Sequence, residues 1–272
     1  QCKRTQTSHN YLNIESKKTN NGNKKMGCFV DEKVLAIKRK ILFGENDENA
    51  FIGFKNKKEF KFTKNMLKQT EFLLRKTTSK SQKIPAEEDT NYKQIIPYTI
   101  LSHKNKIFCY QRTPKGTENR LHNKYSLGIG GHINKADEKD KTKIIETAMK
   151  RELNEEIQLE GNFDSKIIIG YINKETGIVE KVHFAIVYLI KLENEKIKIK
   201  EKKLANGKFM NIKEIEKKKN LLEDWSQTIL PHLKKIMKKK SWIKKRKNSV
   251  KKSPRKFVEK KYYAPAKHPK NV

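Results

Sequence analysis

One stretch, residues 127–159, constrains the chain more than any other. A glycine-rich turn comes first, and a run with three carboxylates, Glu152, Glu155 and Glu156, follows it. Spacings of three and four residues place all three on one face of a helix. Like charges this close disfavour one another's ionisation, so a bound cation would stabilise the cluster. Hard divalent cations with oxygen ligands, Mg²⁺ above all, suit such a face. The alternative is a helix face that is simply solvated.

The flanking sequence predicts strands on both sides of this helix. Alternating or apolar runs with turn residues between them predict strands at 94–101, 106–112, 166–171, 178–192 and 197–199. A short strand is expected within 30–43, part of 60–75 is expected to be helical, and helices are expected at 213–220 and 221–237. Several strands, a helix, more strands and terminal helices predict an α+β sandwich with a mixed sheet.

The central motif resembles the Nudix box. Five residues separate Gly131 from the acid Asp137, and the run from Arg151 to Glu156 follows, with Leu159 after it. The box therefore occupies about residues 131–159, and the surrounding blocks are similar to the predicted MutT-type phosphoesterase branch of that superfamily. The resemblance implies an α/β/α sandwich. It also implies Mg²⁺- or Mn²⁺-dependent hydrolysis of nucleoside diphosphates linked to another moiety.

The resemblance also implies roles for individual residues. Glu152, Glu155 and Glu156 would hold the metal, and one of them or another nearby glutamate would be the general base. Arg151 would be structural and would pin the loop through an acidic partner. The chain departs from the pattern in three ways. The family glutamate is Asp137, the spacer 138–150 has 13 residues instead of seven, and Gln158 replaces a glycine.

Other residues are candidates for the same site. Glycines let the backbone approach a ligand closely, and arginines can grip phosphates, although surface charge is the alternative for the arginines. The candidate substrate-binding residues are Gly130, Gly131, Arg112 and Arg120. Further carboxylates could come from Asp137, Glu175 and Glu180. We expect His183 to be a core residue, and His132 has no evident partner in the sequence.

Charge divides the chain into three parts. The net charge is +33, but 56 of the 64 basic residues are Lys, and specific phosphate or base recognition leans more on Arg. We expect a disordered extension at 1–25, a domain at 26–237 and a Lys-rich disordered tail at 238–272. Met26 is the first methionine, and we expect the biological start there. The tail is expected to be solvated, with non-specific nucleic-acid contact as the alternative.

The composition limits the cellular compartments and the functions that suit this chain. Three separated cysteines argue for a reducing compartment, and neither a span of 18 apolar residues nor a signal peptide is visible. We therefore expect a cytoplasmic enzyme without a membrane partner, acting on a nucleotide or another diphosphate. The alternatives are a catalytically weak nucleotide-binding module and a nucleic-acid-associated protein acting through its tail. Isomerisation of an isoprenoid diphosphate is a weaker alternative, because no cysteine stands beside the motif.

Overall fold

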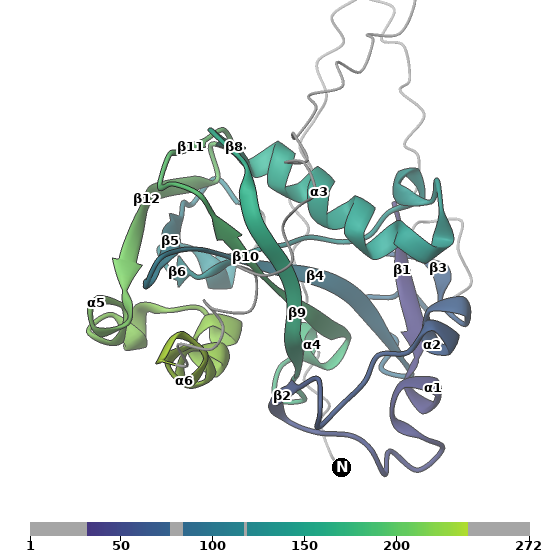
Figure 1. Ribbon diagram of the computed structural model, residues 1–272. Coiled ribbons are helices and arrows are strands. Elements are labelled where there is room, and N and C mark those ends of the chain that lie inside the picture. The colour runs from purple at the N-terminus through teal and green to yellow at the C-terminus, as the bar shows by residue number, and fades with distance from the viewer. Residues whose placement is uncertain (1–31, 77–83, 117–118, 239–272) are drawn as a thin grey trace, which may run out of the picture. The chain divides into compact units, whose positions relative to one another are not determined.

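The computed structural model describes residues 32–76, 84–116 and 119–238 (Figure 1). Its main element is a mixed ten-stranded sheet, and the central path runs in the order β12-β5-β4-β10-β9-β2. The strands of this path are β2 (Gly53–Asn56), β4 (Tyr92–His103), β5 (Lys106–Arg112), β9 (Phe163–Asn173), β10 (His183–Leu192) and β12 (Leu204–Asn211). The predicted α+β class, mixed sheet and 94–112 hairpin are confirmed.

The two central strands, β4 and β10, run parallel. Their register joins His183 to Gln94 at one end and Lys191 to Ser102 at the other. β10 is buried along almost its whole length, as expected for an apolar strand that is covered on both faces. The short strands β1 (Lys33–Lys38), β3 (Glu71–Leu74), β6 (Tyr125–Ser126) and β7 (Gly128–Ile129) complete the sheet. β8 (Ile157–Leu159) and β11 (Ile197–Ile199) form a separate two-stranded sheet.

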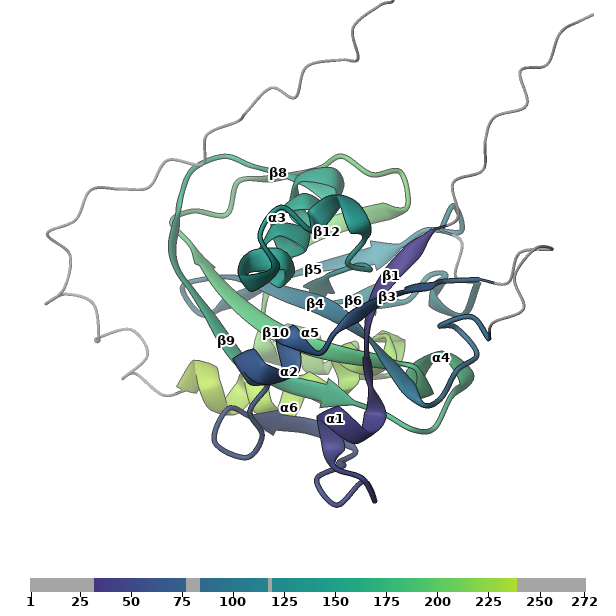
Figure 2. The ribbon, with the colours of Figure 1, turned by 90° about the vertical axis from the view of Figure 1, so that its right-hand side faces the viewer.

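Helices cover both faces of the sheet. α3 (Ile144–Glu156) lies on one face, and α5 (Ile212–Glu216) and α6 (Asp224–Lys238) lie on the other, as Figures 1 and 2 show. Each face has its own apolar core, one containing Met149 and Leu153 of α3 and the other Ile229 and Leu233 of α6. The short helices α1 (Arg39–Phe43), α2 (Lys64–Lys68) and α4 (Ile178–Lys181) connect strands. This is the predicted α/β/α arrangement.

Several predicted boundaries were wrong. Residues 178–181 form α4 instead of the start of a strand, because β10 finds its first partner on β4 only at His183. The short strand expected within 30–43 is confirmed as β1, and α1 follows it directly. The strand before the terminal helices, β12, was not predicted, and it pairs with β5. The helix predicted at 213–220 ends at Glu216, and a 3-10 turn follows at Lys219–Leu221.

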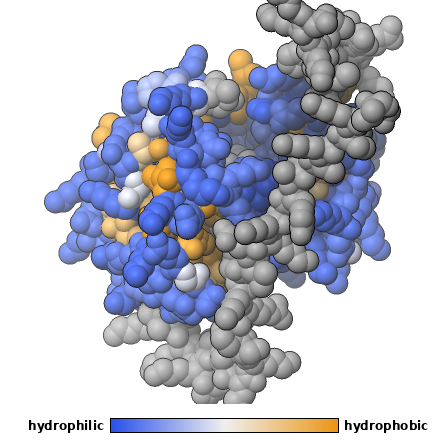
Figure 3. Space-filling view, turned by 90° about the horizontal axis from the view of Figure 1, so that it is seen from above, coloured by the Kyte–Doolittle hydropathy of each residue, from blue (hydrophilic) through white to orange (hydrophobic). Residues whose placement is uncertain are grey.

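The surface is largely hydrophilic, as expected for a chain with many charged residues. Hydrophilic side chains cover most of the face seen in Figure 3, and a small hydrophobic area interrupts them. Among the described residues, no helix combines the length and the apolar character that crossing a membrane needs. The expected extension at 1–25 and residues 239–272 of the expected tail lie outside the described residues.

Candidate active site

The carboxylates of α3 are not a solvated face. The helix packs Ile144, Ala148 and Leu153 into the core. On its other side, Glu152 is 8% exposed and Glu156 is 1% exposed, while Glu155 is exposed to solvent. Burying two acids of the same sign on adjacent turns is costly, because desolvation favours their neutral forms. A bound cation or ligand could offset the desolvation cost of these two carboxylates.

Glu152 rests directly on the glycine turn. A Cβ built on Gly131 would lie 2.4 Å from the carboxylate carbon of Glu152, so only glycine admits this side chain here. Burial raises the pKa of Glu152, and the adjacent Arg151 guanidinium offsets this only in part. Gly130 is equally constrained, because a Cβ there would lie 2.5 Å from the backbone oxygen of Pro97.

We predict that Gly131→Ala lowers activity more than stability. The added methyl group would displace the carboxylate of Glu152, which is the flexible end of a side chain, and the backbone could stay in place. Gly130→Ala is the matched comparison, because its methyl group meets backbone and overpacking typically costs about 1–3 kcal/mol. Urea unfolding and turnover of both variants check this. Equal destabilisation of both, with activity retained in Gly131→Ala, would contradict it.

Glu156 is the most enclosed carboxylate of the helix. Its Oε1 lies 3.3 Å from Nζ of Lys203, while its Oε2 is buried without a hydrogen-bond partner. Burial raises the pKa of Glu156, and the positive charges of Arg112 and Lys203 oppose the shift. Sequence reasoning missed Lys203, because one lysine in a Lys-rich segment carries no distinguishing signal. The pairing of β12 with β5, together with backbone bonds from Lys200 and Glu201 to the oxygen of Glu156, brings it to α3.

Arg151 connects the helix to the loop before it. Its Nε and Nη2 donate to the two carboxylate oxygens of Asp137 at 2.9 and 3.0 Å, and Nη2 also donates to the backbone oxygen of His132 at 2.8 Å. Nη1 donates to Glu152 at 2.6 Å and to Glu155 at 3.1 Å. Asp137 is 2% exposed and accepts a further bond from the backbone N–H of Asn134. Its carboxylate is thus engaged in holding the loop and does not line the cavity described next.

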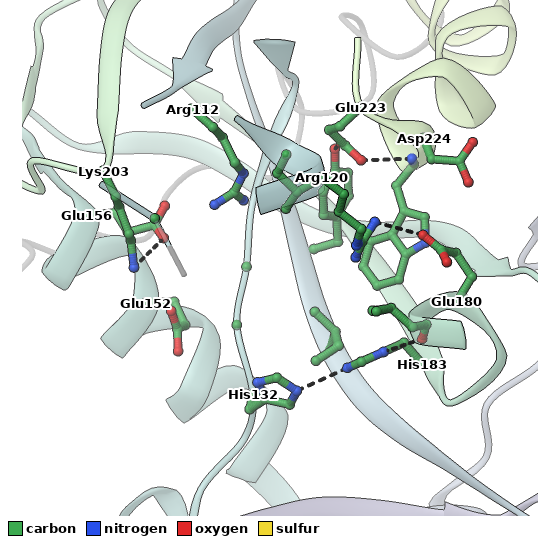
Figure 4. Close-up of a pocket in the computed structure, with 18 of the residues that line it drawn as sticks. Arg112, Arg120, His132, Glu152, Glu156, Glu180, His183, Lys203, Glu223 and Asp224 are labelled. Carbon is green, nitrogen blue, oxygen red and sulfur yellow. Dashed lines mark hydrogen bonds and ion pairs between the residues drawn. The ribbon is translucent and has the colours of Figure 1, made fainter. Parts of the chain in front are cut away.

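A cavity of about 480 Å³ lies between α3 and the start of α6. Figure 4 shows Glu152 and Glu156 on one side of it and the Arg120–Glu180 pair on the other, with Arg112 between them. Glu223, Asp224 and Trp225, at the beginning of α6, form part of its lining. Residues from at least five separate segments therefore converge on one space, and carboxylates and cations face each other across it.

The predicted arginines both line this cavity. Arg112, at the end of β5, donates to the hydroxyl of Tyr110 at 3.3 Å, and its buried Nε has no hydrogen-bond partner among the described residues. Arg120 donates to Glu180 at 2.7 Å, so Glu180 is engaged on the wall opposite α3. An unpaired buried donor is expensive to keep, which makes Arg112 the stronger candidate for binding an anion.

Glu175 does not join the site. It accepts bonds from Arg39, Lys93 and Asn173 at 2.9–3.0 Å, outside the cavity. Burial alone would raise the pKa of Glu175, but these donors outweigh it and the pKa is lowered. Lys93 is fully buried, so this carboxylate neutralises an interior charge. Glu175 therefore belongs to a structural ion cluster. Its position does not support the prediction that it is an extra carboxylate of the site.

His132 has a partner that the sequence does not reveal. Its Nε2 lies 3.0 Å from Nε2 of His183, and Nδ1 of His183 lies 2.6 Å from the backbone oxygen of Val179. Both rings line the cavity, so His183 is more than a core residue (Figure 4). Burial lowers the pKa of both histidines, that of His132 well below its ordinary value. The two residues are 51 positions apart, and only the sheet register brings them together.

The carboxylates of α3 carry the oxygen donors that a divalent cation needs. As the described side chains stand, no three His, Cys, Asp or Glu residues form a ready group of ligands. Arg151 now neutralises Glu152 and Glu155, as it would before a cation arrives. The oxygens of Glu152 and Glu155 and the unpaired buried Oε2 of Glu156 are the hard donors that Mg²⁺ and Mn²⁺ prefer. The residues present therefore fit such an ion after side-chain adjustment.

Comparison with known proteins places this chain in a family. No protein-family model matches it. Protein YmaB of Bacillus subtilis is 37% identical over 150 residues, which are 53% of this chain and 73% of YmaB. The crystal structure of Tm1382, provisionally classed as a Nudix hydrolase, superposes with a TM-score of 0.57 at 24% identity, over 75% of this chain and 99% of Tm1382. The chain therefore belongs to the family of the Bacillus subtilis protein YmaB, and its fold is that of the Nudix superfamily.

Proposed function

We propose that this protein is a Nudix-type hydrolase that cleaves a diphosphate linkage with the help of Mg²⁺ or Mn²⁺. The observation that carries the proposal is the buried carboxylate face of α3, where Glu156 keeps one oxygen unpaired beside the cations Lys203 and Arg112. A buried acceptor and a buried donor that both lack a partner are unfavourable. A ligand that combines a cation with an anionic diphosphate would satisfy both.

The roles follow from the positions of the side chains. Glu152, Glu155 and Glu156 would hold the divalent cation, which when bound neutralises phosphate charge and activates water. Arg112 would bind phosphate oxygens, and Lys203 would exchange its contact with Glu156 for one with the substrate. Water would attack one phosphorus, the bridging P–O bond would break, and Glu152 or Glu155 would take up the proton. Arg151 would hold Glu152 in place through its anchor on Asp137.

The cavity wall beyond the charged groups supports an organic moiety on the substrate. Trp225 stands edge-to-face with Tyr98 at 5.5 Å between ring centroids. The hydroxyl of Tyr98 donates to Glu223 at 2.7 Å, which fixes its ring. A rigid aromatic surface suits a flat ring, and the volume of the cavity is in the range of small-molecule sites. We therefore propose a nucleoside diphosphate derivative, or a related organic pyrophosphate, as the substrate.

A substrate screen tests this function. Purified full-length protein is incubated with ADP-ribose, nucleotide sugars, dinucleoside polyphosphates and nucleoside triphosphates, with Mg²⁺, with Mn²⁺ and with EDTA. Release of phosphate or of a nucleoside monophosphate that stops in EDTA is expected for at least one compound. Binding without product across the whole panel, measured by calorimetry, would contradict hydrolysis and favour a nucleotide-binding module.

A further inference from the structure

The histidine pair has no part in the reaction as described so far. His132 directly follows the glycine turn against which Glu152 packs. The backbone oxygen of His132 accepts a hydrogen bond from Arg151. His183 begins β10, and its backbone is fixed by pairing with Gln94 of β4. Two imidazoles at the wall of the cavity are placed where they can contact the attacking water of the proposed reaction or the substrate.

The hydrogen bonds assign the proton on each ring. A backbone carbonyl only accepts, so the bond to Val179 requires a proton on Nδ1 of His183. A neutral His183 then has a bare Nε2, which must accept from Nε2–H of His132. Burial lowers the pKa of both rings, so both are neutral near pH 7. Neutral His132, protonated on Nε2, therefore carries a lone pair on Nδ1.

That lone pair is available to a ligand. Among the described residues, Nδ1 of His132 has no hydrogen-bond partner. It is also not among the fully buried atoms without a partner, so a ligand can reach it. A neutral acceptor cannot bond to phosphate oxygens, which are acceptors too. It requires a donor, and the attacking water and the hydroxyl groups of the organic moiety both supply O–H donors.

We propose that Nδ1 of His132 accepts a hydrogen bond from an O–H group bound in the cavity, either the attacking water or a hydroxyl of the substrate's organic moiety. His183 is the positioning residue that fixes this tautomer by relaying the constraint from Val179. The proposal rests on the proposed function, since it concerns the same cavity. It adds a neutral, hydroxyl-directed contact to the charged and aromatic contacts of the proposed site.

Nuclear magnetic resonance tests the tautomers without any turnover. In the full chain labelled with ¹⁵N histidine, long-range proton–nitrogen spectra at pH 7.5 distinguish the two tautomers. We expect His132 to be protonated on Nε2 and His183 on Nδ1. Addition of ADP with Mg²⁺ should then shift the Nδ1 resonance of His132. A proton on Nδ1 of His132, or a Nδ1 signal unmoved by ADP and Mg²⁺ at millimolar concentration, would overturn the proposal.

Two substitutions at one position separate a ligand contact from a structural one. His132→Asn keeps an acceptor near the place of Nδ1 but loses the contact with His183. His132→Gln keeps a donor for His183 but removes the acceptor from the cavity. With ADP-ribose as the probe, we expect His132→Gln to lose about tenfold in kcat/KM, as for one net hydrogen bond, and His132→Asn to lose less. The reverse order would show that His132 serves only to hold His183.

The kinetic constants identify the donor. A loss confined to kcat indicates the attacking water, and a loss confined to KM indicates a substrate hydroxyl. If the wild-type protein hydrolyses nothing in the substrate screen, the proposed function fails. The tautomers and the response to ADP then still decide the contact of His132. Thermal unfolding of both variants controls for misfolding.

Discussion

Replacing Glu152 with Gln is expected to lower kcat/KM for the hydrolysed diphosphate by about 10²–10⁴-fold, the usual contribution of a positioned acid–base group. The substitution keeps the shape of the side chain and removes its charge, so both cation binding and proton uptake suffer. The fold should remain intact. Burial raises the pKa of Glu152, which means that the protein already disfavours the charged form. A neutral amide is therefore tolerated, and steady-state kinetics with circular dichroism measure both effects.

The control for this prediction lies on the same helix. Glu146 is in the first turn of α3, pairs with Lys150 at 3.1 Å and also contacts Lys166, away from the cavity. Glu146→Gln makes the same chemical change and should leave turnover within about threefold of the wild type, since surface pairs contribute about 0–1 kcal/mol. Full hydrolysis by Glu152→Gln with unchanged Mg²⁺ dependence would refute the assignment of the site.

The second large effect concerns stability. Arg151→Met should lower the free energy of unfolding by about 3–5 kcal/mol, because it leaves the carboxylate of Asp137 buried without its charged partner. Asp137 is 2% exposed and receives two of its three bonds from Arg151. Urea unfolding at pH 7 measures the loss. The double variant with Asp137→Asn should recover part of it, because no uncompensated charge then remains.

Lys150→Met provides the comparison for this second prediction. Lys150 is the preceding residue of α3, is exposed, and pairs only with Glu146 in the described part of the chain. Its loss should cost less than about 1 kcal/mol. If Arg151→Met and Lys150→Met unfold at the same urea concentration, Arg151 does not anchor the loop, and the positioning of Glu152 needs another explanation.

The sequence was sufficient for the carboxylate face of α3, because helical periodicity is a local property. Two departures from the Nudix pattern, Gln158 and the long spacer 138–150, also have simple structural explanations. Gln158 lies in β8, extended and paired with Lys198 of β11, so no glycine is required there. The first part of the long spacer, residues 138–143, includes a 3-10 turn capped by Asp140, and Lys141 donates to backbone oxygens of Lys68 and Thr70. The remaining spacer residues, 144–150, are the first turns of α3. The extra residues therefore leave the register of the helix unchanged.

What the sequence could not supply depends on contacts between distant segments. Lys203 reaches Glu156 through the pairing of β12 with β5 and the backbone bonds of Lys200 and Glu201 to Glu156. His132 meets His183 because β7 and β10 both pair with β4. Glu175 was predicted to lie at the site because it is near a turn in the sequence. Its ion pairs with Arg39 and Lys93 hold it outside the cavity. Local spacing predicts which groups share a helix face, but tertiary pairing decides which walls face each other.

The division of the cavity between one helix and several loops has an evolutionary consequence. The carboxylates proposed to hold the cation all come from α3, whereas Arg112, Arg120, Lys203 and Trp225 come from four other segments near the ends of regular elements. Mutations in those segments can change what is bound without moving the carboxylates, because loops tolerate substitution better than packed helices. Related chains could thus acquire new substrates one loop at a time while conserving a single reaction.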